Sequence, residues 1–190
     1  MSPILGAQGG LSARAYGFGS LVAPLGDYQA IMTATVDSGG TPSISFTSIP
    51  QTYKHLQIRY LANNTASANY KMSLRFNSDS GSNYNWHWLA GDGSAASAGA
   101  NDEYTAMRLS KLNYGSTYWS SGIIDLLDYT NANKNTTGKS LGGWDSNGSG
   151  TIELASGLWK NTSTITSIDI VPYSGGILAG SQIALYGLKG

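Results

Sequence analysis

The chain has 190 residues, of which 12% are charged, and its 11 basic residues balance its 11 acidic ones. This length suits one domain with a sizeable core, and the balanced charge argues against nucleic acid or an anionic membrane as a partner. Cysteine is absent, so neither thiolate chemistry nor a disulfide framework is expected, and no apolar run is long enough to predict a membrane-spanning helix.

The first segment, residues 1–26, is predicted to be an assembly arm. It carries a single charged residue, Arg14, and glycines interrupt its apolar side chains. Each glycine weakens a helix by about 1 kcal/mol relative to alanine. Because such a segment cannot bury its apolar residues alone, we expect another subunit to cover them. The residues expected to make these contacts are Ile4, Leu5, Leu11, Arg14, Tyr16 and Phe18.

From residue 28 onward, apolar residues alternate with other residues, a period of two that is typical of strands. The first strand is predicted at Tyr28–Val36, and Asp37–Gly40 has the composition of a tight turn. Ile44 and Phe46 continue the alternation after this turn. The two segments are therefore predicted to pair as a hairpin.

Further strand-like segments continue along the chain, separated by turns rich in glycine, asparagine and serine. No long segment shows the 3.6-residue period of a helix. The small residues of Gly91–Asn101 predict a flexible loop. The other predicted strands are Leu56–Tyr60, Tyr70–Phe76, Tyr84–Trp88, Tyr104–Leu112, Tyr118–Tyr129, Lys139–Asp145, Thr151–Trp159, Ile165–Val171 and Gln182–Leu188.

These short strands predict an all-β fold, an antiparallel β-sandwich of the jelly-roll type. We expect the sandwich domain to occupy residues 27–190, preceded by the arm at residues 1–26. The 12 tyrosines and 5 tryptophans support a packed structure, and they exceed what a small core needs. Some rings are therefore expected at the surface, where they stack on sugars or fill a subunit interface.

The sequence carries little catalytic machinery. His55 and His87 are the only histidines, so a zinc site would need carboxylates beside them. No serine lies in a Gly-x-Ser-x-Gly elbow. We expect a protein that is not an enzyme, with no catalytic residue, metal or cofactor. A glycosidase-like carboxylate pair stays open, because such pairs lie on distant strands of a sandwich; the candidates are Asp92, Asp102, Glu103, Asp125, Asp128 and Glu153.

One short motif, Asp145–Gly150, has two interpretations. Its Asp, Asn and Ser at the first, third and fifth positions, with glycine at the sixth, match the opening of a calcium loop. The twelfth position, where such a loop has a glutamate, is Ser156. Asn147-Gly148 is also the dipeptide that most strongly favours a hairpin turn. The hairpin turn is preferred, and whether the segment binds calcium stays open.

Binding residues are expected in the loops at the ends of the sandwich, because loops vary without disturbing the sheets. These loops are rich in amide and hydroxyl groups, which suit a neutral glycan when aromatic rings lie nearby. The candidate rings are Tyr114, Tyr118 and Trp119. The candidate loops are Asn63–Asn69, Gly91–Asn101, Asn113–Tyr118 and Asn131–Gly138.

Several stretches across the chain carry a family resemblance: Met1–Gly6, Ser12–Gly17, Ser43–Pro50, Tyr53–Arg59, Arg75–Asp79, Gly81–Tyr84, Ser156–Trp159 and Ile183–Gly187. They resemble small virion proteins of tailed bacteriophages, many from marine and cyanobacterial phages. The family contributes no catalytic residues.

The resemblance implies a structural protein of the virion, assembled in the host cytoplasm and anchored to other virion proteins by its arm. A tail-fibre or host-attachment role is favoured, in which a homo-oligomer binds a glycan of the host surface. A capsid decoration protein that stabilises the head is the alternative, and a glycan hydrolase is a second one. Neither nucleic acid nor a membrane is expected as a partner.

Overall fold

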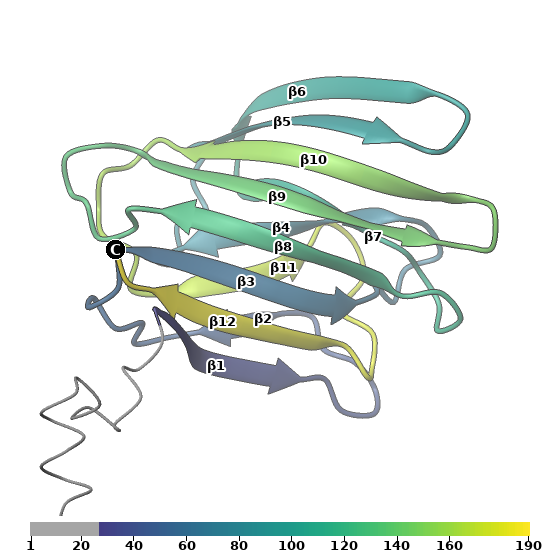
Figure 1. Cartoon of the computed structure of the whole chain (residues 1–190), viewed down its shortest axis with the longest axis horizontal. Helices are drawn as coiled ribbons and strands as arrows, with labels where there is room; N and C mark the ends of the chain where they lie inside the picture. The colour runs from purple at the N-terminus through teal and green to yellow at the C-terminus, as the bar shows by residue number, and fades with distance from the viewer. Residues whose placement is uncertain (1–26) are drawn as a thin grey trace, which may run out of the picture.

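A computed structural model describes residues 27–190, which form two packed β-sheets (Figure 1). The predicted arm, with Ile4, Leu5, Leu11, Arg14, Tyr16 and Phe18, lies outside the described residues. Among residues 27–190, no helix is long and apolar enough to cross a membrane. The strands are β1 (Tyr28–Thr35), β2 (Ile44–Phe46), β3 (His55–Ala62), β4 (Tyr70–Phe76), β5 (Tyr84–Gly91), β6 (Ala96–Tyr104), β7 (Met107–Leu112), β8 (Ser120–Leu127), β9 (Thr136–Asp145), β10 (Gly150–Trp159), β11 (Ile168–Pro172) and β12 (Gln182–Leu188).

The two sheets differ in size. The larger has eight strands in the order β1-β12-β3-β8-β9-β10-β5-β6, and the smaller has four in the order β2-β11-β4-β7. In Figure 1 the larger sheet lies in front of the smaller one, and the strand pairs in both are antiparallel. The prediction of an all-β antiparallel sandwich is confirmed. The chain passes repeatedly from one sheet to the other, with more strands than the eight of a regular jelly roll.

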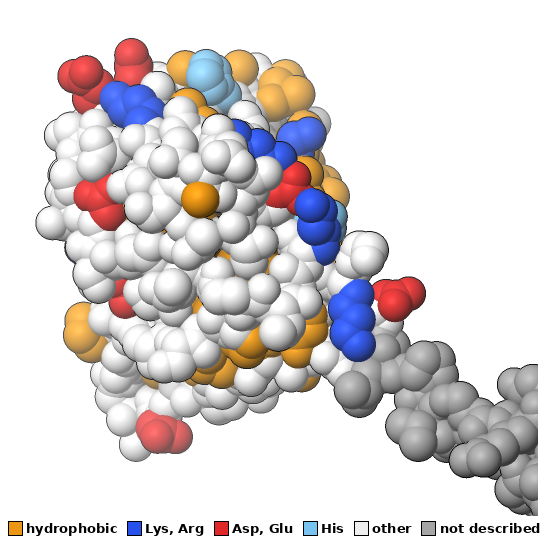
Figure 2. Space-filling model, turned by 90° about the vertical axis from the view of Figure 1, so that its left-hand side faces the viewer, with side chains coloured by type: hydrophobic (Ala, Val, Ile, Leu, Met, Phe, Trp, Pro, Cys, Tyr) orange, Lys and Arg blue, Asp and Glu red, His pale blue; other side chains and the backbone are white. Residues whose placement is uncertain are grey.

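The core lies between the sheets, and strands such as β3 and β10 contribute alternate residues to it. Leu56 and Ile58 of β3 and Leu74 and Phe76 of β4 are fully buried. Trp159 of β10 packs against Phe76 with ring centroids 5.4 Å apart. Each large side chain buried in this way stabilises the fold by about 1.5–3 kcal/mol. The surface is mostly uncharged at the end of the sandwich that faces the viewer in Figure 2.

The predicted hairpin of Tyr28–Val36 with Ile44 and Phe46 is wrong. β1 pairs with β12 in the large sheet, whereas β2 pairs with β11 in the small sheet. After the turn, Thr41 pairs with Ile177 in an isolated β-bridge. The chain crosses from the large sheet to the small sheet at this point. Alternation specifies which face of a strand is buried, but it does not specify the neighbouring strand.

The predicted loop at Gly91–Asn101 is also wrong, because most of it belongs to the β5–β6 hairpin. The turn is short, and Asp92 Oδ1 accepts the backbone N–H groups of Ser94 and Ala95, each at 2.8 Å. β6 pairs with β5 at the edge of the large sheet. Glycine is favoured at position 99, since a Cβ there would lie 2.8 Å from Nε1 of Trp88.

Candidate functional site

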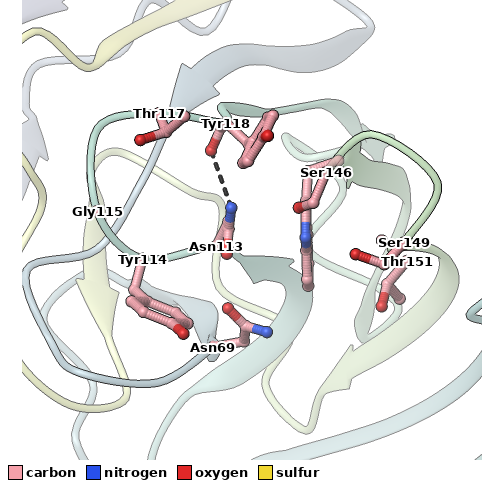
Figure 3. Close-up of a pocket in the computed structure, with 11 residues that line it drawn as sticks. Asn69, Asn113, Tyr114, Gly115, Thr117, Tyr118, Ser146, Ser149 and Thr151 are labelled. Carbon is pink, nitrogen blue, oxygen red and sulfur yellow. Dashed lines mark hydrogen bonds between the residues drawn. The ribbon is translucent and has the colours of Figure 1, made fainter.

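A hollow of about 610 Å³ lies at one end of the sandwich, where the β7–β8 loop and the β9–β10 turn come together (Figures 1 and 3). We call it the aromatic groove. It brings together two segments that the sequence analysis considered separately, the Asn113–Tyr118 loop and the Asp145–Gly150 motif. Its lining residues are Asn69, Asn113, Tyr114, Gly115, Thr117, Tyr118, Trp144, Ser146, Ser149, Gly150 and Thr151.

Buried asparagines hold the β7–β8 loop in place. Asn113 Nδ2 donates to the backbone oxygen of Tyr118 at 2.9 Å, a bond drawn in Figure 3. From β3's end, the fully buried Asn63 donates from Nδ2 to the backbone oxygens of Gly115 and Tyr118, each at 2.7 Å. Because these bonds fix the loop backbone, the groove exists before a ligand arrives, which lowers the entropic cost of binding.

Three aromatic side chains line the groove. Tyr114 and Tyr118 are 49% and 40% exposed, and Trp144 of β9 is half-buried. Lys111 Nζ lies 5.6 Å from the centroid of the Trp144 ring. In Figure 3, Tyr114 lies on one side of the groove, and Ser146, Ser149 and Thr151 lie on the other. A ligand in the groove therefore meets flat apolar rings and hydroxyl groups together.

Trp119, the third predicted ring, does not line the aromatic groove. Its Nε1 donates to the backbone oxygen of Ser116 at 3.1 Å, and its ring lies against Gly180. The structure thus brings Tyr114 and Tyr118 together and places Trp119 elsewhere. Asn69 belongs to the predicted loop Asn63–Asn69, and the structure places it in the groove. Trp144 was not singled out as a binding residue from the sequence. Its contribution depends on the meeting of distant turns, for which the sequence carries no local signal.

The Asp145–Gly150 segment is the turn of the β9–β10 hairpin. Asn147 and Gly148 have positive φ angles of 59° and 96°, as such a turn requires. Asp145 Oδ1 accepts the backbone N–H of Asn147 at 2.7 Å, and Ser146 N donates to Ser149 O at 2.6 Å. Within residues 27–190, no cluster of three or more histidine or acidic side chains is arranged to hold a metal. The hairpin interpretation therefore accounts for the motif.

A smaller cavity of about 270 Å³, the Glu153 cavity, adjoins the aromatic groove, and Thr151 lines both. Glu153 is 2% exposed, and its Oε2 pairs with Nζ of Lys71. Burial lowers the pKa of Lys71, although the hydrogen bond and charge of Glu153 act in the opposite direction. Glu153 Oε1 is buried and has no hydrogen-bond partner. The other residues of the lining are Trp88, Ala90, Gly91, Asp92, Ser97 and Lys111.

The remaining candidate carboxylates lie apart from this end of the sandwich or already have partners. Asp125 accepts a hydrogen bond from Gln57 Nε2 at 2.6 Å on the outer face of the large sheet. Asp128 pairs with Lys134 and Lys54, whose hydrogen bonds lower its pKa to about 2. Asp102 and Glu103 lie on the edge strand β6. Of the six candidates, only Asp92 and Glu153 line a common cavity.

Comparison with protein-family models gives no match, and a search of the curated proteins finds no similar sequence. The ligand class that suits the groove is therefore inferred from the residues that line it. They present partly exposed rings, amides and hydroxyls, and none of the residues lining the aromatic groove is charged.

Proposed function

We propose that this chain is a host-attachment protein of a tailed-bacteriophage virion and that the aromatic groove binds a neutral glycan of the host surface. The observation that carries the proposal is the gathering of Tyr114, Tyr118 and Trp144 in a groove whose lining is otherwise uncharged and polar. The virion assignment is supported by the sequence stretches that resemble phage virion proteins.

The groove suits a sugar for two chemical reasons. Aromatic rings offer flat apolar faces to the C–H face of a pyranose. Asn69, Ser146 and Thr151 offer amide and hydroxyl groups that can donate to and accept from sugar hydroxyls. Because no lysine, arginine or acid lines the groove, its recognition does not require a charged sugar.

The proposed partners follow from the weakness of a single site. One shallow sugar site gives low affinity, so several copies on one particle are needed for useful avidity. We therefore propose a homo-oligomer, attached to other virion proteins through residues 1–26. The capsid decoration role is the alternative proposal, and it requires no ligand in the aromatic groove.

A printed array of bacterial lipopolysaccharide and capsular oligosaccharides tests the proposal. The purified chain should bind a subset of them, and Tyr114→Ala or Trp144→Ala should weaken that binding about tenfold, which corresponds to about 1.4 kcal/mol. Tyr173→Ala is the matched control, because Tyr173 is 56% exposed but lies outside the groove.

The same variants, built into phage particles, separate the two virion roles. If the chain mediates attachment, the groove variants should adsorb poorly to host cells while the particles stay intact. Unchanged adsorption together with fragile heads would support capsid decoration instead. Cleavage of an array oligosaccharide by the natural chain would contradict the expectation that the protein is not an enzyme.

A further inference from the structure

The Glu153 cavity contains a buried charged oxygen with no partner. It lies where the edge of the small sheet meets the large sheet, between Lys71 of β4, Lys111 of β7 and Glu153 of β10. Lys71 Nζ forms an ion pair with Glu153 Oε2 and lies 4.7 Å from the centroid of the Trp88 ring. Glu153 Oε1 remains without a donor although the residue is only 2% exposed.

A buried carboxylate oxygen without a donor is uncommon, because more than 90% of buried polar groups are hydrogen-bonded. Glu153 lines the cavity although Oε1 itself is buried, so a ligand that enters can supply the missing donor once the carboxylate turns toward it. The cavity also offers the hydroxyls of Ser97 and Thr151 and the ammonium of Lys111. Its polar groups thus include both donors and acceptors.

We propose that the Glu153 cavity binds a second sugar residue of the glycan in the aromatic groove, with one sugar hydroxyl donating to Glu153 Oε1. This inference rests on the proposed function. The two sites adjoin, since Thr151 lines both and Lys111, which lines the Glu153 cavity, lies 5.6 Å from the Trp144 ring centroid. A chain of two or more sugars can therefore extend from one to the other.

The charges of the cavity favour a hydroxyl over an ion. Two lysines, Lys71 and Lys111, are balanced by Glu153 and Asp92. Lys71 is already paired with Glu153, and Asp92 accepts backbone N–H groups of its own turn. A neutral group that donates one hydrogen bond satisfies Glu153 Oε1 and leaves this balance unchanged.

Two substitutions test this subsite on the array oligosaccharide that the natural chain binds most tightly. Glu153→Gln removes the carboxylate, and Ser97→Phe adds a ring to the cavity lining from β6, a strand that contains neither Lys71 nor Glu153. Thr33→Phe is the control, because Thr33 is exposed on β1, at the edge of the large sheet opposite to β6. We expect Ser97→Phe and Glu153→Gln to lower affinity at least tenfold and Thr33→Phe to leave it within twofold.

The outcomes separate the subsite from the function. If the natural chain binds no array oligosaccharide, the proposed function fails and the subsite fails with it. If the natural chain binds but Ser97→Phe binds as tightly as Thr33→Phe, only the second subsite is overturned. If Glu153→Gln does not fold, the affinity of Ser97→Phe alone still tests whether the cavity binds the second sugar.

A second and independent observation is an apolar patch on the outer face of the large sheet, away from both cavities. Leu89, Leu141, Ile152 and Leu154 are 54%, 46%, 62% and 54% exposed. Leu154 lies directly opposite Leu89 on one neighbouring strand and Leu141 on the other, and Leu141 lies opposite Ile123. The row therefore runs without a break across β8, β9, β10 and β5.

This face is seen edge-on at the right of Figure 2, where hydrophobic side chains gather at the surface among lysine, arginine and histidine. A hollow of about 380 Å³ lies within the row, lined by His87, Leu89, Lys139 and Leu154 among others. A contiguous apolar patch of this kind marks an interaction site, because monomeric proteins rarely expose one.

We infer that the apolar row is the contact between two copies of this chain. The apolar row crosses four strands, and β3 and β6 flank it in the sheet. These six strands are spaced about 4.8 Å apart, and strands of eight residues, such as β3, β5 and β8, rise about 3.3 Å per residue, so the row and its flanks present on the order of 750 Å². A standard interface buries about 800 Å² per partner. The face therefore has the size that a second copy needs.

The charges beside the apolar row also favour a copy over a strongly charged partner. Arg59 Nε donates to Gln57 at 2.9 Å, Gln57 donates to Asp125 at 2.6 Å, and Asp125 lies opposite Lys139. Arg59 and Lys139 are basic and Asp125 is acidic, so these three adjacent strands carry a net charge of only +1 from these groups. The face has no large excess of either sign that would select an acidic or basic protein.

Sedimentation of the full chain at micromolar concentration tests the interface. The natural chain should be oligomeric, and Leu154→Lys should raise the dissociation constant of the oligomer at least tenfold. Thr33→Lys is the control, because Thr33 is exposed on β1 at the far edge of the same sheet. A monomeric natural chain would overturn the inference, as would a Leu154→Lys variant that stays oligomeric. A chain that is monomeric until residues 1–26 are deleted would show that the arm covers the face instead.

Discussion

Trp159 donates a hydrogen bond from its indole Nε1 to Oδ2 of Asp79 over 2.7 Å. Asp79 also accepts the backbone N–H of Gly81 at 2.8 Å and the side-chain amide of Asn83 at 2.9 Å. Burial opposes the ionisation of Asp79, but these three hydrogen bonds outweigh it and hold its pKa below the usual value. The β4–β5 connection is thereby joined to the largest buried ring of the core.

Asp79→Ala should destabilise the protein by roughly 1–3 kcal/mol, because it leaves the buried Trp159 N–H without an acceptor. The pKa of Asp79 is lower in the folded protein than in the unfolded chain, where it is about 3.9. The stability that Asp79 contributes is therefore fully present above about pH 3.9 and is lost as the pH falls through the pKa of the folded state. Urea unfolding between neutral and acid pH measures both effects. Asp37→Ala, at an exposed turn residue, is the control.

Two buried tyrosines predict a loss of stability in alkali. Burial raises the pKa of Tyr60 to about 12, against the opposing hydrogen bond with Ser110, and burial likewise raises the pKa of Tyr84 to about 12. In the unfolded chain these tyrosines ionise at about pH 10. The stability of the fold should therefore be retained below pH 10 and lost between about pH 10 and 12. Tyr60→Phe should reduce this alkaline loss, whereas Tyr118→Phe should not. An equal loss in all three proteins would contradict the assignment.

Gly142 of β9 lies under the Tyr60 side chain. A Cβ at this position would overlap the Tyr60 hydroxyl and lie 2.7 Å from Ser110 Oγ. Gly142→Ala should therefore lower the free energy of unfolding by about 1–3 kcal/mol through overpacking. The matched control is Gly91→Ala, whose Cβ would meet a single atom at 4.0 Å. Equal free energies of unfolding for the two variants would show that Tyr60 and its neighbours can move to make room for the added methyl group.

The β9–β10 turn predicts that a chelator will not change stability. Asp145 Oδ1 is engaged with the backbone of its own turn, and the motif has Ser156 where a calcium loop has glutamate. The midpoint of thermal unfolding should be the same in EDTA and in millimolar calcium. A higher midpoint in calcium that disappears in Asp145→Asn would establish the calcium site instead.

Deleting residues 1–26 should leave the midpoint of thermal unfolding within a few degrees, because the core described above is formed by residues of the sandwich itself. The same deletion should abolish incorporation into particles if the arm is the assembly contact. Calorimetry of the truncated chain and the composition of particles that contain it measure the two effects. Unfolding of the truncated chain would show that the arm belongs to the core.

The sequence by itself determined which residues of a strand face the core. Leu56, Ile58 and Tyr60 were predicted on one face of their strand, and all three are buried. This works because successive side chains of a strand point to opposite faces, so an alternating pattern identifies the buried side without knowledge of the neighbours. The turn at Asn147-Gly148 was also predicted locally, because its positive φ angles favour those two residues.

Strand partners were decided only by the tertiary structure. The alternation of Tyr28–Val36 fits pairing with either the next strand or the last one, and the packing of two sheets selected β12. Ala96–Tyr104 has little intrinsic tendency to form a strand, and its pairing with β5 outweighs this.

The candidate site divides in the same way. Tyr114 and Tyr118 were found from the composition of their loop, whereas Trp144 joins them only because the β9–β10 turn lies beside that loop. Glu153 did carry a sequence signal, a charged residue at an inward position of the series Glu153, Ala155, Gly157 and Trp159. Its partner Lys71 lies on the other sheet, so the pair forms only when the two sheets pack against each other.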